Sequence, residues 1–173
     1  MKLHPKHPDV RSRQWAWYAN SVAASALVRD RDRARIYRWL GMDLHSDWIK
    51  PGCFFAGSPF VLGRGSSLNY GCFIENVAPV EIGEDTGVGF HVRIITSSHA
   101  PAEPPQTWGE WTPSPVRIGS RCWIGAGATI LPGVTVADSC IVAAGAVVTR
   151  DCGSHGLYGG VPARRLRDIP QGP

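Results

Sequence analysis

A six-residue spacing of aliphatic residues runs through most of this chain and limits what it can fold into. From Ile82 the blocks read IGEDTG, VGFHVR and IITSSH, and from Ile118 they read IGSRCW, IGAGAT, ILPGVT, VADSCI, VAAGAV and VTRDCG. Each block begins with Ile or Val, and its fifth residue is small or β-branched. Three earlier blocks, LGRGSS, LNYGCF and IENVAP, follow a similar rule before a two-residue shift. Such a period predicts a repeat architecture.

Hexads of this kind predict an all-β solenoid, a prism of short parallel strands in which three blocks form one coil. The leading aliphatic residue fills the interior, and the small fifth residue fits where the wall is tight. Gly relieves the corners, where the backbone angles disfavour other residues. Coils stack at the spacing of neighbouring strands, about 4.8 Å, so that each coil buries the next.

Four of the five cysteines occupy the fifth position of a hexad, and Cys53 lies outside the repeat. These four are Cys72, Cys122, Cys140 and Cys152. Cys122 and Cys140 are one coil apart, so they should stack on successive coils. We interpret the cysteines as buried wall residues. Their odd number, the absence of a CxxC pair and the absence of an apolar signal core favour a reducing, cytoplasmic compartment.

The repeat divides the chain into three parts. Residues 1–55 are predicted to form an N-terminal helical segment and entry, 56–153 the prism, and 154–173 a basic C-terminal tail. Residues about 12–40 have the patchy apolar face and charge pairs typical of a helix, with Gly41 as its stop. Residues 100–117 break the hexad rule with Pro and Trp and return in phase, which indicates an excursion loop of the kind that often carries function.

The net charge of +4 is unevenly distributed and argues against a nucleic-acid-binding protein. Residues 1–50 hold 10 Lys and Arg against 5 Asp and Glu, whereas residues 51–173 hold 8 against 9. A nucleic-acid-binding domain would carry a basic stripe across its main body, and this body is nearly neutral. The Arg-rich stretch 29–38 is therefore predicted to be a solvated helix face, and membrane contact is not expected. No apolar run reaches the about 18 residues that a spanning helix needs.

His99 is the strongest candidate for chemistry outside the prism wall. It ends the last regular hexad before the excursion loop, where a loop can cover a general base. His91, at the fourth position of its hexad, is predicted to be a surface residue.

At these residues the sequence resembles the hexapeptide-repeat acyltransferases, a family with a left-handed parallel β-helix. The segment ITSSH ends at His99, the pair Asn69-Tyr70 precedes it, and the segment WIG follows it from Trp123. The spacings between these three motifs resemble those of the maltose, galactoside and nodulation-factor acetyltransferases, and the N-terminal segment looks like that of exopolysaccharide O-acetyltransferases. The resemblance covers residues about 60–167 and implies a homotrimer with its sites between neighbouring subunits.

The resemblance implies an acetyl-CoA-dependent O-acetyltransferase acting on a sugar or a glycosylated metabolite. His99 would be the general base for direct transfer of the acetyl group to a hydroxyl, and Asn69 would hydrogen-bond the acceptor or the tetrahedral centre. The backbone N–H of Ala126 would meet the oxyanion. Neither a metal nor a covalent acyl-enzyme is expected.

The same resemblance assigns a set of small, hydroxyl and basic residues to CoA. The small residues would form a flat channel for pantetheine on successive coils, and arginine suits the phosphates. The set is Ala126, Ala144, Gly145, Thr149, Arg150, Arg164 and Arg167, together with Trp123. Trp123 would stack on CoA, close the subunit interface or simply pack on its own chain.

The acceptor site is assigned to Glu75, Asn76, Trp108 and Trp111. Where similar sugar acetyltransferases carry an Asp seven residues after the Asn, this chain has Asn76, preceded by Glu75. Trp108 and Trp111 lie three residues apart in the loop. They are predicted either to form a wall for the acceptor or to hold the loop onto the trimer.

Three other functions are compatible with parts of the pattern. A γ-type carbonic anhydrase uses the same prism with zinc, but it needs a short H-x4-H pair, and His91 and His99 are eight residues apart. A non-catalytic β-helix scaffold would not require Asn69, His99 and the arginine set together. An N-acyltransferase acting on an amino sugar fits the same motifs.

Overall fold

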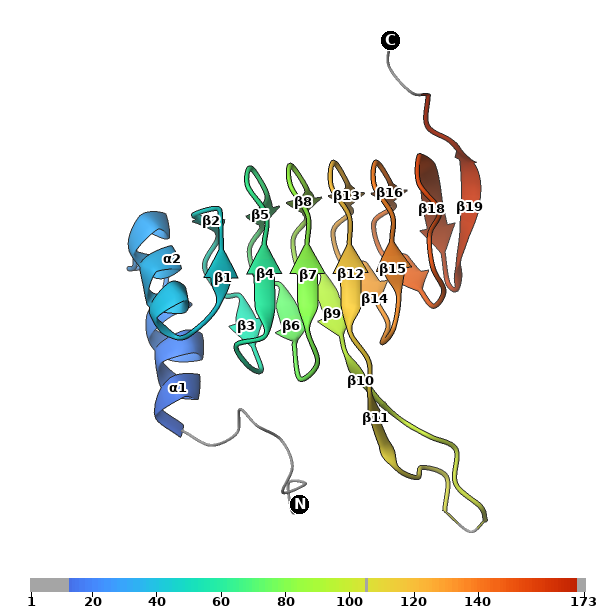
Figure 1. Ribbon diagram of the computed structural model, residues 1–173, viewed down its shortest axis with the longest axis horizontal. Coiled ribbons are helices and arrows are strands. Elements are labelled where there is room, and N and C mark those ends of the chain that lie inside the picture. The colour runs from blue at the N-terminus through green and yellow to red at the C-terminus, as the bar shows by residue number, and fades with distance from the viewer. Residues whose placement is uncertain (1–12, 105, 171–173) are drawn as a thin grey trace.

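Parallel strands stack in three sheets that form the sides of a prism (Figure 1). The structure is a computed structural model, and it describes residues 13–104 and 106–170. Sheet A contains β1 (Asp43–Leu44), β4 (Phe60–Leu62), β7 (Val80–Ile82), β12 (Val116–Ile118) and β15 (Thr135–Val136). Sheet B contains β2 (Trp48–Ile49), β5 (Ser67–Leu68), β8 (Gly87–Val88), β13 (Trp123–Ile124), β16 (Ile141–Val142), β18 (Gly156–Gly160) and β19 (Ala163–Asp168). Sheet C contains β3 (Phe54–Phe55), β6 (Phe73–Glu75), β9 (Arg93–Ile95), β14 (Thr129–Ile130) and β17 (Val147–Val148). The expected fold class, a left-handed parallel β-helix with an N-terminal helix and an excursion loop, is confirmed.

The register between coils explains the six-residue period. Thr129 pairs with Val147, so a regular coil advances the chain by three hexads. Val61 pairs with Glu81, a longer step that absorbs the two-residue shift in the repeat. Glu81 then pairs with Arg117, a step that is twice a regular coil. The excursion therefore returns in phase, as the sequence predicts.

The leading aliphatic residues point into the prism and form its core. Ile94 and Ile130, for example, are fully buried and pair on successive coils. Cys122 and Cys140 stack as predicted, because the residues that follow them pair with each other. Each such column removes apolar surface from water, which stabilises the fold by about 25 cal/mol per Å².

The prism begins at Asp43, well before the expected start at residue 56. The strands β1, β2 and β3, between Asp43 and Phe55, already form a coil that pairs with β4, β5 and β6. The hexad rule misses this coil because its buried residues Leu44, Ile49 and Phe55 are five and six residues apart, rather than six and six.

The expectation that Cys53 lies outside the repeat is wrong for the same reason. The residues after Cys53 and Cys72 pair with each other, so the two cysteines occupy the same wall position on successive coils. Both thiols donate to the backbone carbonyl of Asn69, at 3.3 and 3.2 Å. The neighbouring Cys53 thiol and burial raise the pKa of Cys72 well above its usual range. Cys72 therefore stays protonated as a wall residue.

Two helices cap the first coil, where a single helical segment is predicted. α1 (Arg13–Trp17) continues into the π-helical turn η1 (Tyr18–Ala23), and α2 (Asp30–Trp39) follows after a break. Gly41 has a φ of +93°, in the left-handed region, and follows the helix as the predicted stop. In the described part of the chain, no helix is long and apolar enough to cross a membrane.

Arg33 of α2 ties these helices to the prism. Its side chain is fully buried, and the guanidinium donates to the carbonyls of Ala23 and Ile49 at 2.8 and 2.9 Å. The same group also donates to the Asp30 carboxylate at 2.6 Å. A buried charge is tolerated here because its donors find acceptors.

The C-terminal tail continues the solenoid before it turns back. β18 pairs in parallel with β16 and so begins a sixth coil, and β19 pairs antiparallel with β18. Positions 1–12 of the predicted N-terminal part, with His4 and His7, and positions 171–173 of the predicted tail lie outside the described residues.

We expect Arg33→Ala to lower the free energy of unfolding by about 3–5 kcal/mol, because several buried carbonyls lose their donor. Urea denaturation followed by circular dichroism measures this loss. The matched control is Arg35→Ala on the same helix, whose ion pair with Asp32 is exposed and should contribute less than about 1 kcal/mol. Equal losses in the two variants would show that Arg33 is not the anchor.

Candidate active site

The predicted site residues divide between two edges of the prism. We call the turns that lead from sheet B to sheet C the B/C corner, and those that lead from sheet C to sheet A the C/A corner. The B/C corner carries Asn69, Ala126, Ala144 and Gly145, and the C/A corner carries Glu75, Asn76, His99, Thr149 and Arg150. Both corners border sheet C, on opposite sides, so one chain does not bring Asn69 and His99 together.

His99 leaves the prism on a hairpin that projects from the C/A corner (Figure 1). It ends β10 (Ser97–His99), which pairs antiparallel with β11 (Trp111–Pro113). The imidazole Nδ1 lies 3.0 Å from the carbonyl oxygen of Gly109. Because a carbonyl only accepts, the neutral ring carries its proton on Nδ1 and its lone pair on Nε2. His99 is exposed, so Nε2 is available as a base.

The excursion loop brings both predicted tryptophans to His99. The Trp108 ring meets the imidazole edge to face, with centroids 5.1 Å apart and an interplanar angle of 71°. Trp111 lies directly opposite His99 in the hairpin register. Trp108 is 65% exposed, so an aromatic surface lies open beside the imidazole.

Asn69 is oriented by its own turn at the B/C corner. Its Oδ1 accepts the backbone N–H of Tyr70 at 3.0 Å. The side-chain amide therefore presents its other end, the Nδ2 donor, away from this contact. Such a donor suits a hydroxyl oxygen or an oxyanion.

Small residues follow Asn69 along the B/C corner, as the sequence predicts. Ala126 and Ala144 are exposed on successive coils, and the N–H of Gly145 donates to the Ala126 carbonyl at 2.9 Å. A Cβ added to Gly127 or Gly145 would meet no atom within 4 Å, so the strip beside them is open. Within the described part of the chain, the N–H groups of Ala126 and Ala144 make no hydrogen bond.

The remaining residues predicted to bind CoA lie further along the prism. Thr149 and Arg150 are exposed at the C/A corner, beyond the fourth coil. Arg164 and Arg167 are exposed on β19, whereas Arg165 between them is held by Asp168 and the hydroxyl of Tyr158. Arg165 thus has a structural role that its neighbours do not share.

Trp123 covers the outer face of sheet B. A Cβ added to Gly87, on the preceding coil, would lie 2.8 Å from the indole, so the ring packs against that glycine. The ring is still 50% exposed. Of the three predicted roles, packing on its own chain is observed, and its exposed face remains open to a ligand or a neighbouring subunit.

Asn76 is not placed to contact an acceptor. It is fully buried, its Oδ1 accepts the N–H groups of Ala56 and Gly57 at 3.0 Å each, and its Nδ2 donates to the Gly57 carbonyl at 2.6 Å. The resemblance assigned it to the acceptor because an Asp occupies this position in similar enzymes. In this chain the amide holds the turn of the preceding coil instead.

Two residues near His99 were missed by sequence reasoning. The Gly109 carbonyl orients the imidazole, and no side-chain pattern reveals a backbone acceptor in a loop. Thr96, fully buried, accepts the N–H groups of Val77 and Ala78 at 3.1 and 3.0 Å. Thr96 did have a signal, because it and Asn76 are both polar residues at the third position of their hexads.

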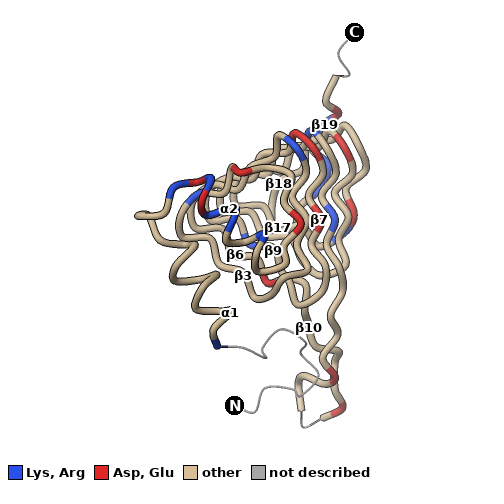
Figure 2. The backbone as a smooth tube through the Cα atoms, turned by 60° about the vertical axis from the view of Figure 1, so that its left-hand side comes forward, with Lys and Arg blue, Asp and Glu red and all other residues tan. Residues whose placement is uncertain are grey.

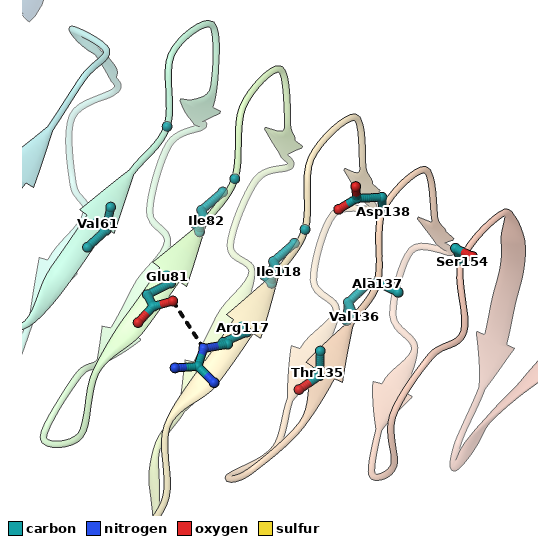
Figure 3. A pocket seen from close by; sticks show the side chains of 13 residues that line it. Val61, Glu81, Ile82, Arg117, Ile118, Thr135, Val136, Ala137, Asp138 and Ser154 are labelled. Atoms are coloured by element: carbon teal, nitrogen blue, oxygen red, sulfur yellow. Dashed lines mark hydrogen bonds and ion pairs between the residues drawn. The ribbon is translucent and has the colours of Figure 1, made fainter.

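The outer face of sheet A carries a shallow open depression of about 660 Å³, shown in Figure 3. Glu81 and Arg117 form an ion pair of 3.0 Å across it. None of the predicted site residues lines this depression. Residues 13–104 and 106–170 contain no group of three or more His, Cys, Asp or Glu that could hold a metal ion.

Comparison with known proteins connects this geometry to a family. Residues 115–150 match the family described as hexapeptide repeat of succinyl-transferase. Galactoside O-acetyltransferase of Escherichia coli (strain K12) is 32% identical over 123 residues, or 70% of this chain and 61% of that protein. Nodulation protein L of Rhizobium meliloti (strain 1021) is 46% identical over 104 residues, or 60% of this chain and 56% of that protein. A solved structure of galactoside acetyltransferase in complex with coenzyme A has a TM-score of 0.82 at 25% identity, covering 98% of this chain and 86% of that chain.

The hexapeptide repeat, the fold and these relatives point in the same direction. The chain is similar to the hexapeptide-repeat acyltransferases in its repeat and in its fold. Its two sequence relatives named above are a galactoside O-acetyltransferase and a nodulation protein, and the chain spans 61% and 56% of their lengths.

We expect Asn76→Ala to lower the free energy of unfolding by about 2–5 kcal/mol, since the buried N–H and carbonyl of Gly57 both lose their partner. Thermal and urea denaturation measure the change. The control is Asn69→Ala, which removes an amide from a partly exposed position and should leave stability within about 1 kcal/mol. If Asn76→Ala leaves the free energy of unfolding unchanged, the amide does not hold the turn.

Proposed function

We propose that this protein is an acetyl-CoA-dependent O-acetyltransferase that acts on a hydroxyl of a sugar or a glycosylated metabolite. The observation that carries the proposal is the orientation of His99, whose Nδ1 is held by the Gly109 carbonyl while Nε2 faces outward as a base. Two relatives support the choice of acceptor and donor. One is named for O-acetylation of galactosides, and a galactoside acetyltransferase of the same fold was solved with coenzyme A.

The proposed transfer is direct. His99 Nε2 takes the proton of the acceptor hydroxyl as the oxygen attacks the thioester carbonyl, and the C–O bond forms. Asn69 Nδ2 donates to the acceptor, and the N–H of Ala126, which makes no hydrogen bond within the described residues, donates to the oxygen of the tetrahedral intermediate. The C–S bond then breaks, and the imidazolium returns its proton to the departing thiolate of CoA. No acyl-enzyme forms, so no cysteine takes part.

The order of the residues along the prism supports this assignment. Asn69 and His99 lie on the second and third coils, Ala126 on the fourth, and Ala144 and Thr149 on the fifth. The arginines of β19 follow at the end of the solenoid. Acceptor, thioester, pantetheine and phosphates would then lie in sequence along one groove.

The proposed site needs two chains. Asn69 and His99 lie at opposite borders of sheet C, and three prisms with sheet C facing a threefold axis place the B/C corner of each against the C/A corner of the next. Phe54 and Phe73 support this packing, because their stacked rings, 4.7 Å apart, are exposed on sheet C. Figure 2 shows charges of both signs along the side that carries β7, which would face solvent. A homotrimer is therefore proposed, with five free, buried cysteines consistent with the cytoplasm.

We expect His99→Ala to reduce turnover by about 100- to 10,000-fold, since a positioned general base contributes that factor. Release of free CoA thiol from acetyl-CoA, with galactosides, maltose and amino sugars as acceptors, measures it. His45→Ala is the matched control, because His45 is also exposed but lies between β1 and β2, at the edge of the prism that does not border sheet C. Full turnover by His99→Ala, with the oligomer intact, would remove the proposed function.

Subunit complementation tests the shared site. His99→Ala and Asn69→Ala are each expected to be nearly inactive, yet mixed trimers contain some sites with an intact His99 from one chain and an intact Asn69 from its neighbour. Random mixing in equal amounts after unfolding and refolding should restore about a quarter of wild-type activity. If mixing restores nothing, the two residues act within one chain or not at all.

The acceptor wall is tested with Trp108→Ala. Loss of this exposed ring should raise the acceptor KM by about 5- to 20-fold, consistent with the burial of a large apolar surface. The acetyl-CoA KM should not change. An unchanged acceptor KM would show that the tryptophan holds the loop and does not bind the sugar.

A further inference from the structure

Side-chain oxygens hold the turns of the C/A corner in a repeated arrangement. Each accepts two consecutive backbone N–H groups at the point where the chain leaves sheet C. Asn76 does this for the first coil, and Thr96 does it for the second. In both cases the acceptor belongs to the next coil of the prism.

The third coil uses the same arrangement in the opposite direction. The N–H groups of Thr96 and Ser97 both donate to Glu75 Oε2 at 3.1 Å, from the coil before. The fourth coil has no such acceptor to offer, because its corresponding residues are Leu131 and Pro132. Glu75, on the second coil, therefore supplies the oxygen that accepts these two hydrogen bonds.

These bonds fall where the excursion hairpin departs. Ser97 is the first residue of β10, and His99 is the last. The Ser97 hydroxyl adds a bond of 2.7 Å to Glu75 Oε1, so both carboxylate oxygens are engaged by this short segment. Backbone N–H groups that leave a sheet ladder need such partners, and their acceptor sets the direction of the strand.

We propose that Glu75 is a positioning residue for His99, which rests on the proposed function of His99 as general base. Its carboxylate fixes the root of β10, and the Gly109 carbonyl fixes the imidazole at the other end of the strand. Glu75 was assigned to the acceptor site from sequence, but both of its oxygens face the chain's own hairpin. The residue acts on the reaction through the placement of Nε2, where an error of about 1 Å costs about 100-fold in rate.

The first test is Glu75→Ala, assayed with acetyl-CoA and the acceptor of the above panel that turns over fastest. We expect kcat to fall about 10- to 100-fold and the acetyl-CoA KM to stay within about twofold, because the residues proposed to bind CoA lie on the fourth and later coils, whereas Glu75 lies on the second. Glu81→Ala is the matched control, since Glu81 is a carboxylate on the neighbouring sheet that pairs only with the exposed Arg117 among the described residues. It should leave kcat unchanged.

Conservative variants separate the effect of side-chain length at position 75 from the effect of its charge. Gln keeps an oxygen that accepts both N–H groups and an amide that donates to the Ser97 hydroxyl, so Glu75→Gln should restore kcat to within about threefold of wild type. Glu75→Asp keeps the charge but is one methylene too short, and it should behave like Ala. The reverse order, with Asp active and Gln inactive, would overturn the proposal in favour of an electrostatic contact with substrate.

A double-mutant cycle separates this proposal from the proposed function. If Glu75 acts through His99, Glu75→Ala should cause no further loss in a His99→Ala background. An undiminished loss in that background would overturn the positioning role while leaving His99 as the base. Full activity of His99→Ala alone would instead remove the proposed function.

Nitrogen NMR of the imidazoles gives a readout that needs no acceptor. The His99 signal, assigned by its absence in His99→Ala, should report the Nδ1–H tautomer in the wild type and in Glu75→Gln. In Glu75→Asp it should shift toward a mixture of tautomers, because the bond to Gly109 loosens. An unchanged tautomer in Glu75→Asp, together with an unchanged kcat, would overturn the proposal even if Glu75→Ala fails to fold.

Discussion

The hydrogen bonds between coils run along the length of the prism, and the rest of the structure depends on them. One line of these bonds follows the B/C corner, through Lys50 N to Leu68 O, Asn69 N to Val88 O, Gly89 N to Ile124 O and Gly125 N to Val142 O. Such ladders keep successive coils in contact around the whole perimeter, so every coil must close on nearly the same path. An inserted segment has to leave and re-enter at neighbouring points, which is why the excursion forms a hairpin. The Ser114 N–H closes it by donating to the Thr96 carbonyl.

Because each coil must close on nearly the same path, the proposed enzyme keeps its folding core and its chemistry in different places. The interior is occupied by aliphatic columns and cannot hold a ligand, so chemistry is confined to corners and to what projects from them. Chemistry-bearing side chains gather at the two corners beside sheet C, and the third corner carries surface ion pairs such as Arg64–Glu84. A trimer would convert two incomplete edges into one groove.

Much of this arrangement could be predicted from the sequence, because the hexads from Ile82 onward keep one phase. The stacking of Ala126 on Ala144 and the return of the excursion in phase both follow from counting residues. The first coil was missed, since Leu44, Ile49 and Phe55 break the count, and Cys53 was missed with it. Asn76 and Glu75 are assigned to the acceptor by the resemblance alone, and their hydrogen-bond partners on other coils leave no pattern in the sequence. Spacing alone does not show which way a polar side chain turns at a corner.

The support of His99 from the coil before has a consequence for how such proteins can diverge. Since Glu75 anchors the root of the hairpin from the second coil, the loop between Ala100 and Gly109 could be lengthened or replaced while the Gly109 carbonyl and the strip at Ala126 and Ala144 are kept. A lineage could exchange this loop, and with it the compound that is modified, while inheriting the donor half unchanged. The prism and its proposed CoA strip would then stay the same while the loop sets the acceptor.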